Sequence, residues 1–535
     1  MQSKAIPNPI LADTADKESA IHPLSKLSPW NAPSIFLLAS LFILVLVTRI
    51  PFRTEYLFNW DSANFALALR DFDVTRHAPH PPGYPYFVLA GKALQGITGE
   101  ANSALVLESI IISALAVIAL MALGQAMFSK TIGLVAALLL TGSVTFWTYG
   151  EIALAYTSLA LFSSLGALFA YQTIFLGKDR GIHLALAYSV GSGFRPDLLL
   201  FLAPLLLVSC LRLPIKKAIL VIAIAIAGVL LWLVPTMLLS GGVSSYIAVM
   251  QAYLSQDVID KYSSTSRGVG GLVVNIRDTA SYLFYSLYGT SVLFLALIAS
   301  WALRLGRGNL STLRPGRGDL APTERVLDHH QMTGKREVFI LLWLAPMAVF
   351  YLIVHIGDPG YIFSILPAVL LLLSYGLVSA IERLVPSSKR NWALGAVVIS
   401  ILLLNTGIFV LHQRPLTSWG LRQNDQAMEA KLELLSSRLT DSPPLALFYD
   451  SYKHVQFYLP DYKSKAWIDT AVGAPAAISL PPGTREILLM DNSLVRAGDS
   501  LSGQEIEIAK GYKVKIVSAE NRNTVKYDGH NLTLE

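Results

Sequence analysis

Apolar runs of about 18 or more residues recur between residues 33 and 411, a pattern typical of helices that cross a membrane. The first run ends at Pro51 and the last ends at Leu411. Together the runs predict about eleven crossings, of which the fifth and sixth are short. The predicted ranges are 33–50, 103–123, 132–148, 152–176, 182–190, 198–211, 219–239, 281–303, 338–354, 361–381 and 392–411.

Beyond Leu411 the pattern changes to that of a soluble domain. Helical periodicity over 421–439 is followed by short strand-like segments at 445–449, 486–490 and 512–518, separated by Pro- and Gly-rich turn signals. The chain therefore divides into an N-terminal tail (1–31), a transmembrane core (32–411) and a small α/β domain (412–535). We predict a polytopic α-helical membrane protein that carries this small domain outside the membrane.

Composition agrees with a bilayer as the solvent. The chain is 53% hydrophobic and only 15% charged, whereas soluble domains carry about 25% charged residues. The net charge of +6 fits the basic bias of cytoplasmic loops, so it does not indicate a nucleic-acid partner. The single cysteine, Cys210, excludes an intrachain disulfide and a cysteine-rich metal site. Residues 1–31 lack the apolar core of a signal peptide and predict a cytoplasmic tail.

The basic residues predict the orientation of the chain. With the N-terminus inside, alternate loops on one side hold Lys130, Lys178, Arg180, Arg212, Lys216, Lys217, Arg304, Arg307, Arg314, Arg317, Arg325, Lys335, Arg336, Arg383, Lys389 and Arg390. This side is the cytoplasm by the positive-inside rule. The opposite side receives the polar segments 59–86, 149–151, 193–197, 241–278 and 355–361 together with the C-terminal domain. We expect a multi-pass protein of the inner (plasma) membrane with a periplasmic C-terminal domain.

The first external loop, residues 59–86, carries the strongest candidate chemistry. Asp61 precedes an amphipathic helical segment, so it fits a helix N-cap. It also fits a general base that takes a proton from an acceptor hydroxyl. The loop then forms a rigid corner, HPPGYP at 80–85, in which proline and Gly83 explain a stiff turn. The turn does not explain His80 or Tyr84, and His80 suits contact with a phosphate, a metal or a sugar hydroxyl.

Three further external segments carry ionisable groups. Glu151 fits either a helix first turn or a functional carboxylate at membrane depth. Asp197 suits a helix start, whereas Arg195 opposes the helix dipole and fits either phosphate binding or snorkelling to lipid headgroups. A tight turn at 355–361 accounts for the glycines and the proline of this segment. It does not account for His355, Asp358 and Tyr361, which are therefore candidates for lining a pocket. Residues 241–278 predict a loop that covers the acceptor or is simply mobile.

Taken together these motifs resemble those of the GT-C membrane glycosyltransferases, in the branch of protein O-mannosyltransferase-like and aminoarabinose-transferase-like enzymes. The similarity covers roughly residues 32–410. The motifs that carry it are WDS at 60–62, HPPGYP at 80–85, YGE at 149–151, GFRPD at 193–197 and GYIFSILP at 360–367. Many relatives have Asp-Glu where this chain has Asp61-Ser62, so a role for the second acid does not carry over.

The resemblance implies an inverting transfer of a sugar from a polyprenyl-phosphate donor to an acceptor hydroxyl on a glycan, lipid or protein, with Asp61 as the base. Some relatives use a divalent metal and others need none, so the cofactor stays open. Donor-phosphate and substrate binding are assigned to His80, Tyr84, Arg195, Asp197, His355 and Tyr361. Acceptor orientation or metal binding is assigned to Glu151 and Asp358.

Two alternatives come from other classes of protein. A flippase for lipid-linked glycans would show internal repeats and a site near the membrane midplane, but the chain has no convincing repeat and its polar groups gather on one face. A non-catalytic assembly protein of the cell envelope would use the C-terminal domain to recruit partners. The enzyme requires Asp61, His80, Glu151 and Arg195 to converge on one cavity.

Overall fold

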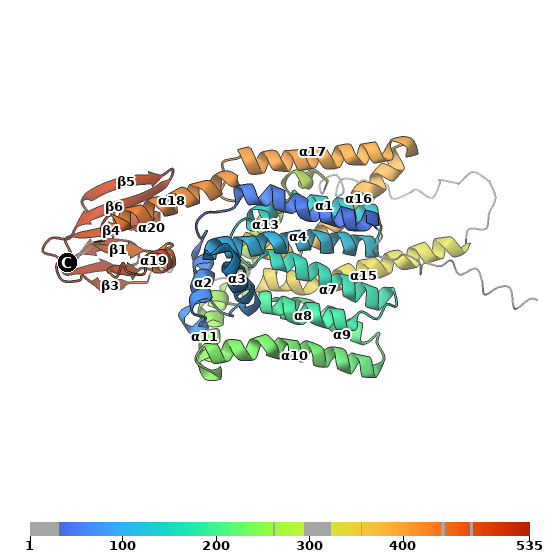
Figure 1. Ribbon diagram of the computed structural model, residues 1–535, viewed down its shortest axis with the longest axis horizontal. Coiled ribbons are helices and arrows are strands. Elements are labelled where there is room, and N and C mark those ends of the chain that lie inside the picture. Colours follow the sequence, from blue (N-terminus) through green and yellow to red (C-terminus); the bar gives the residue numbers. More distant parts are fainter. Residues whose placement is uncertain (1–31, 261–262, 294–322, 355, 440–443, 471–473) are drawn as a thin grey trace, which may run out of the picture.

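The computed structural model describes residues 32–260, 263–293, 323–354, 356–439, 444–470 and 474–535. A bundle of long helices lies beside a smaller domain built on β-sheets, and this domain sits at one end of the bundle (Figure 1). The last helix of the bundle, α17 (Arg390–Leu411), leads directly to α18 (Ser418–Ser436) of the smaller domain. The chain therefore enters that domain from one end of the bundle.

Seven helices within the described ranges are long and apolar enough to cross a membrane. They are α1 (Ala32–Arg49), α4 (Ala101–Met127), α7 (Thr157–Phe175), α10 (Ile215–Leu239), α15 (Thr323–Ile353), α16 (Leu366–Leu384) and α17. The other predicted crossings coincide with the shorter helices α5 (Lys130–Thr141), α8 (Gly181–Phe194) and α9 (Leu198–Cys210). The predicted crossing at 281–303 falls partly outside the described residues.

The centre of the bundle is formed by α4 and α7. More than 70% of the residues in the apolar stretch of each of these helices are buried. Both helices also lack the polar face that a surface helix needs. By contrast α10 and α17 are only 22% buried, and their outer faces carry exposed leucine and isoleucine side chains such as Leu231 and Leu403. Apolar outer faces of this kind suit contact with lipid tails.

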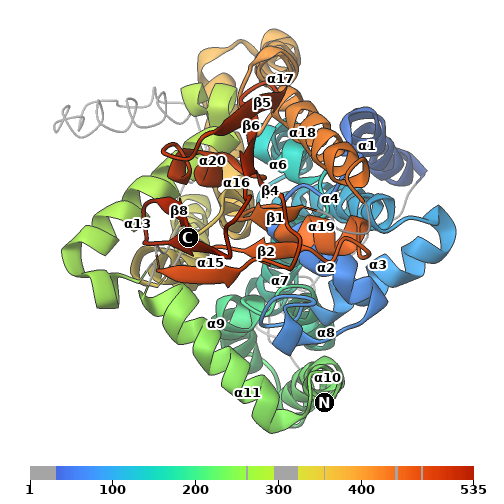
Figure 2. The same ribbon diagram turned by 90° about the vertical axis from the view of Figure 1, so that its left-hand side faces the viewer.

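Mostly short helices, together with the 24-residue helix α13, lie at the end of the bundle that faces the sheet domain (Figure 2). They are η2 (Ile50–Phe52), α2 (Trp60–Arg70), η3 (Val74–Arg76), α3 (Pro85–Thr98), α6 (Val144–Tyr149), α11 (Val243–Ala252), η4 (Tyr253–Ile259), α13 (Ser264–Leu287), η5 (Tyr288–Thr290) and η6 (Pro359–Ser364); η7 (Ser387–Lys389) precedes α17 at its other end. The prediction of a loop over 241–278 is wrong, because α11, η4 and most of α13 occupy it. Its Ser, Thr and Gly residues favour loops in isolation, but α13 is held by packing on α15, where Asn275 donates to the carbonyl of Leu352 at 3.2 Å.

The C-terminal domain contains two sheets. The larger has the strand order β2-β1-β4-β6-β5, in which β1 (Leu445–Phe448) pairs in parallel with β2 (Lys465–Trp467) and β4 (Glu486–Leu489). The remaining strands of that sheet, β5 (Gly503–Ala509) and β6 (Tyr512–Ser518), are antiparallel. The smaller antiparallel sheet has the order β3-β7-β8, with β3 (Ala476–Ser479), β7 (Thr524–Tyr527) and β8 (Leu532–Leu534).

Two helices, α19 (Tyr452–Tyr458) and α20 (Asn492–Ala497), complete this domain with α18. The expected small α/β domain is therefore confirmed. The predicted strands correspond to β1, β4 and β6. The other strands were not predicted; β2, β3, β7 and β8 have three or four residues each, and β5 carries polar Gln and Glu residues.

The C-terminal domain is docked on α2 and on the segment that leads into it. The Asp425 carboxylate of α18 accepts hydrogen bonds from the backbone N–H groups of Glu55 and Tyr56 at 3.0 and 3.1 Å. The Tyr458 hydroxyl of α19 accepts one from the N–H of Leu57 at 2.9 Å. In addition, Arg70 of α2 donates to the carbonyl of Phe457 at 3.0 Å and lies over its ring. The C-terminal domain thus holds the chain both before and after Asp61.

Candidate active site

Asp61 lies in the first turn of α2 but does not cap it. The cap is Asn59, whose side-chain oxygen accepts a hydrogen bond from the backbone N–H of Ser62 at 3.0 Å. An amide in this position satisfies one of the free N–H groups at a helix start. The Asp61 side chain is therefore left for other contacts and is 32% exposed. The structure therefore excludes the interpretation of Asp61 as the helix N-cap.

His80 lies beside Asp61 at the corner between η3 and α3. Its Nδ1 atom is 3.4 Å from Oδ1 of Asp61. The corner depends on Gly83, which has a φ of +121°, where a Cβ atom would also lie 3.0 Å from the Thr236 side chain. From α11, the Tyr246 hydroxyl donates to the carbonyl of Pro82 at 2.9 Å and supports the corner. The rigid turn therefore fixes the position of His80 against Asp61.

Arg195 is a buried cation enclosed by three tyrosine rings. Its guanidinium carbon lies 5.3, 4.4 and 4.9 Å from the ring centres of Tyr84, Tyr156 and Tyr361. Asp197 accepts hydrogen bonds from its Nε and Nη2 atoms at 3.3 and 2.8 Å. A guanidinium has five N–H donors, so this ion pair does not use all of them. Because Arg195 is only 3% exposed, it does not reach lipid headgroups by snorkelling.

Asp358 lies on the far side of the same cluster. Its carboxylate accepts hydrogen bonds from the Tyr149 hydroxyl and, at 2.8 Å, from the backbone N–H of Gly360 in η6. Burial raises the pKa of Asp358 to about 6, although these hydrogen bonds oppose the change; the charge of Asp61 raises it further and that of Arg195 lowers it. Both charges therefore act on this carboxyl group.

The same two charges also act on His80. Burial lowers the pKa of His80 below its ordinary value, the Asp61 carboxylate opposes this change, and the Arg195 guanidinium adds to it. The imidazole is therefore neutral at neutral pH. The rings of His80 and Tyr84 lie 4.7 Å apart, and both contact Phe65 of α2. One cluster thus unites Asp61, His80, Tyr84, Arg195, Asp197, Asp358 and Tyr361, which come from three separate segments of the chain.

Glu151 belongs to a different group of residues. It lies between α6 and α7, fully buried, where its Oε1 atom accepts a hydrogen bond from the indole N–H of Trp147 at 2.6 Å. Its charge acts on Arg49, whose guanidinium lies 4.7 Å from the Trp147 ring centre and donates to the carbonyl of Thr141 at 2.7 Å. Glu151 thus contacts the scaffold through Trp147, and its buried Oε2 atom has no hydrogen-bond partner within the described residues. His355, another predicted substrate-binding residue, lies outside the described residues.

The cluster contains two neighbouring side chains that could bind a metal ion. Asp61 and His80 supply two candidate donors, but within the described part of the chain no group of three His, Cys, Asp or Glu side chains is close enough to hold an ion. Zinc sites use three or more side-chain ligands and calcium sites use six to eight oxygen ligands, whereas Mg²⁺ is usually held by one or two carboxylates together with substrate phosphates. The assignment of Glu151 and Asp358 as ligands to one metal finds no support in this arrangement.

A cavity opens between α2 and the C-terminal domain. Its volume is about 440 Å³, within the range of about 300–1,000 Å³ typical of small-molecule sites. Asp61 stands on its wall. The other lining residues come from the α2 entry, α18, the segments that follow β1 and β4, and β6, namely Phe58, Asn59, Trp60, Asn424, Met428, Lys431, Asp450, Ser451, His454, Met490, Asp491, Asn492, Tyr512 and Lys513. We refer to this space as the interdomain cavity.

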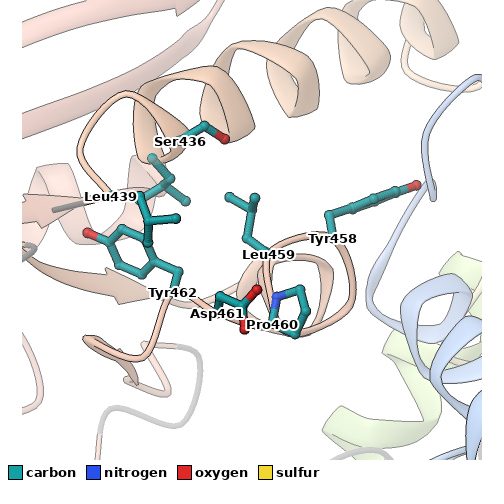
Figure 3. Close-up of a pocket in the computed structure, with 8 residues that line it drawn as sticks. Ser436, Leu439, Tyr458, Leu459, Pro460, Asp461 and Tyr462 are labelled. Carbon is teal, nitrogen blue, oxygen red and sulfur yellow. The ribbon is translucent and has the colours of Figure 1, made fainter. Parts of the chain in front are cut away.

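A second cavity, within the C-terminal domain, is much smaller. Its volume is about 90 Å³, and Figure 3 shows it between the end of α18 and the turn after α19, with the side chains of Leu439, Leu459 and Tyr462 around it. At about 30 Å³ per water molecule, it has room for about three waters. It is therefore too small for a sugar, and of these two cavities the interdomain cavity is the one lined by a residue of the cluster, Asp61.

The sequence did not point to every member of the site. Tyr156 lies in a uniformly apolar stretch, so no pattern distinguishes it from a core residue. The cavity-lining residues of the C-terminal domain, such as Lys431, His454 and Asp491, come from four separate elements. Only the tertiary packing of α18 and α19 against α2 brings them next to Asp61.

Comparison with solved structures shows which fold this is. ArnT from Cupriavidus metallidurans bound to undecaprenyl phosphate aligns with a TM-score of 0.51 at 13% identity, over 91% of this chain and 98% of that chain. Its apo form aligns at 0.50 and 13% identity, over 90% and 97%. The Archaeoglobus fulgidus oligosaccharyltransferase in its apo form aligns at 0.45 and 13%, over 87% and 70%. No family model and no curated protein matches the sequence.

The likeness to ArnT covers nearly the whole of both chains. It confirms the predicted GT-C-like fold of a polytopic helical membrane protein with a small additional domain. At 13% identity the likeness concerns the fold, and it says nothing about which residues act.

Proposed function

We propose that this protein is an integral-membrane glycosyltransferase that moves a sugar from a polyprenyl-phosphate donor to an acceptor hydroxyl. The observation that carries this proposal is the position of Asp61. Its carboxylate is released from capping by Asn59, stands on the wall of the interdomain cavity and shares a cluster with the buried cation Arg195. A base on one side of a reacting carbon and a cation on the other is what glycosyl transfer from a phosphate requires.

In the proposed reaction Asp61 accepts the proton of the acceptor hydroxyl. The hydroxyl oxygen forms a bond to the anomeric carbon of the donor while the bond from that carbon to the phosphate oxygen breaks. The electron pair of the broken bond stays on the polyprenyl phosphate, which leaves with an additional negative charge. Attack from the face opposite the phosphate inverts the configuration of the anomeric carbon.

Arg195 is the group that we assign to the leaving phosphate. A guanidinium binds phosphate through paired N–H donors, and its tyrosine enclosure keeps water away from the interaction. Asp197 holds it in place, while Tyr84 and Tyr361 supply hydroxyl groups beside it. Neutral His80 lies between Asp61 and Tyr84, where it can donate one hydrogen bond to the donor sugar or its phosphate. A lipid phosphate as leaving group is in keeping with the fold, because ArnT was solved with undecaprenyl phosphate bound.

The proposed location is the inner (plasma) membrane, with the cluster and the C-terminal domain on the periplasmic side. The clustering of basic residues in one set of alternate loops supports this orientation. The acceptor is a glycan, a lipid or a protein of the cell envelope.

Transfer from radiolabelled polyprenyl-phosphate sugars to membrane acceptors tests this function. Asp61→Asn keeps the size of the side chain and removes the base, so the rate should fall by about 10²–10⁴-fold with the protein still folded. Asp71→Asn is the matched control, because Asp71 lies on the exposed end of α2 and pairs with Arg76; its rate should equal that of the wild type. Equal rates for Asp61→Asn and the wild type would contradict the role of Asp61. Absence of transfer from every donor would favour a flippase, which a flipping assay detects.

A further inference from the structure

The interdomain cavity contains more polar groups than the transfer reaction needs. Opposite Asp61, the C-terminal domain contributes a buried network in which the Lys431 ammonium group contacts Asp491 at 2.5 Å and Ser451 at 2.9 Å. Asp491 also accepts a hydrogen bond from the backbone N–H of Tyr449 at 2.7 Å. These groups satisfy one another, so they form a rigid floor.

Other polar groups on the cavity wall remain without a full set of partners. The His454 ring is 2% exposed, and its nitrogens make no hydrogen bond of ordinary geometry, although backbone groups of Leu57 and Asp450 lie nearby. The side-chain amide nitrogen of Asn424 is buried and has no acceptor within the described residues. Buried polar groups are nearly always hydrogen-bonded in folded proteins. Such groups on the wall of a cavity indicate a polar ligand that completes them.

The charged groups on the cavity wall disfavour the binding of an anion. Each lysine already has a carboxylate partner: Lys431 pairs with Asp491, and Lys513 lies 3.7 Å from Glu505. By contrast, no lysine or arginine within the described residues forms an ion pair with Asp61 or Asp450. Burial lowers the pKa of His454 to about 4, so this ring adds no positive charge at neutral pH. A phosphate or sulfate group would meet unpaired carboxylates here.

Aromatic rings complete the wall at the Asp61 end. Trp60 lies next to Asp61 in α2, stacks with Tyr452 of α19 at 6.5 Å and lies 5.9 Å from Trp467 of β2. Tyr512 lines the cavity from β6. Sugar-sized ligands suit such a lining, because pockets combine aromatic surface with a few placed polar groups, and carboxylates accept strong hydrogen bonds from hydroxyl groups.

We propose that the interdomain cavity is the acceptor subsite and that it binds an uncharged sugar unit, one hydroxyl of which reaches Asp61. This inference builds on the proposed function and specifies its acceptor as a neutral glycan. The C-terminal domain then supplies acceptor recognition, through Asn424, Asp450 and Tyr512, whereas the transmembrane core supplies the base and the phosphate site.

Binding without any donor tests the subsite separately from transfer. Full-length protein in nanodiscs is titrated with methyl hexosides, hexose 6-phosphates and a serine-containing peptide, and contact is measured by saturation-transfer NMR. Methyl hexosides should bind at least about tenfold more tightly than the phosphorylated sugars or the peptide. Tighter binding of hexose 6-phosphate or of the peptide, or no binding of methyl hexosides, would overturn the proposal.

Two variants locate the binding. Asp450→Asn and Tyr512→Ala should each weaken methyl hexoside binding about tenfold or more, and in the transfer assay they should raise KM for the acceptor with kcat nearly unchanged. Asp499→Asn, an exposed position of the same domain outside the cavity, is the matched control, and thermal unfolding verifies that all three variants fold. Unchanged binding in both cavity variants would refute the subsite. Hexoside binding without transfer from any donor would instead refute the glycosyltransferase and leave the subsite intact.

Discussion

Asn59 and Asp61, two polar residues at the start of α2, have different roles. Asn59 accepts the hydrogen bond that stabilises the helix start, and Asp61, two residues later, makes none of these local bonds. Had Asp61 been the cap, its lone pairs would have been occupied by backbone N–H groups, which lower both its basicity and its reach. The separation of the two roles is what makes Asp61→Asn an informative substitution.

A second residue-scale prediction concerns Arg195. Arg195→Lys preserves the positive charge but loses the planar donor set that pairs with Asp197 and fits between Tyr84, Tyr156 and Tyr361. Loss of a preorganised contact to developing charge typically lowers the rate about 10²–10³-fold. We therefore expect transfer to fall by that order, measured as kcat in single-donor assays.

The matched control for this substitution is Arg277→Lys. Arg277 is exposed on α13 and pairs with the neighbouring Asp278, so its replacement should leave the rate unchanged. Transfer by Arg195→Lys at the wild-type rate would remove Arg195 from the phosphate site and leave it a structural ion pair.

At the scale of elements, the site depends on short irregular segments wedged between long helices. The clearest is η6, which has Asp358 as its N-cap and carries Tyr361. It packs so closely on α7 that a Cβ atom on Gly360 would lie 2.4 Å from the Tyr156 ring. Only a residue without a side chain fits there. The position of Tyr156 against Arg195 therefore depends on a glycine in a neighbouring segment.

Gly360→Ala should displace the Tyr156 ring and with it one side of the tyrosine enclosure of Arg195. We expect loss of about 1–3 kcal/mol of stability, as for overpacking in a well-packed interior, and a fall in transfer rate. Thermal unfolding and transfer assays measure both effects. Gly407→Ala in α17 is the control, because no atom lies within 4 Å of the added Cβ; a Gly360→Ala protein as stable and active as this control would contradict the expected clash.

Sequence patterns identified elements where one physical signal dominates. Long apolar runs predicted α4, α10 and α17, and the strand-like segment at 512–518 coincides with β6. They failed where local preference and tertiary packing disagree. The Ser, Thr and Gly residues of α13 prefer loops, and its helix is stabilised by α15. The corner at 80–85 was predicted because proline and glycine restrict the backbone by themselves, whereas the enclosure of Arg195 by Tyr156 requires two helices and η6 to meet.

At the scale of the whole molecule, the C-terminal domain holds the loop that bears Asp61. Its acceptor groups bind backbone N–H groups of Glu55, Tyr56 and Leu57. Backbone groups are the same in every residue, so no sequence pattern could reveal this contact between segments about 370 to 400 residues apart. The docking also forms one wall of the interdomain cavity, which connects the position of the domain to the geometry of the site.

The docking contact should respond to pH through Asp425. Burial raises the pKa of Asp425 to about 6, with Glu55 and Glu429 adding to the shift, although the two backbone hydrogen bonds oppose it. Because the pKa of this carboxyl group is higher in the docked state than its ordinary value of 3.8, the docked state binds the proton more tightly. Docking should therefore be strongest below about pH 4 and weaken as the pH rises through about 6.

Hydrogen exchange of the Glu55, Tyr56 and Leu57 amides, corrected for the intrinsic effect of pH on exchange, measures this docking between pH 4 and 7.5. Protection should decrease as the pH rises in the wild type and become independent of pH in Asp425→Asn, which cannot ionise. Tyr458→Phe is the control, because it loses the acceptor for Leu57 and should lower protection at every pH without removing the dependence. The same pH dependence in Asp425→Asn and the wild type would show that another group titrates. Loss of the dependence in Asp425→Asn alone would assign the control of docking, and so of the loop that carries Asp61, to this carboxyl group.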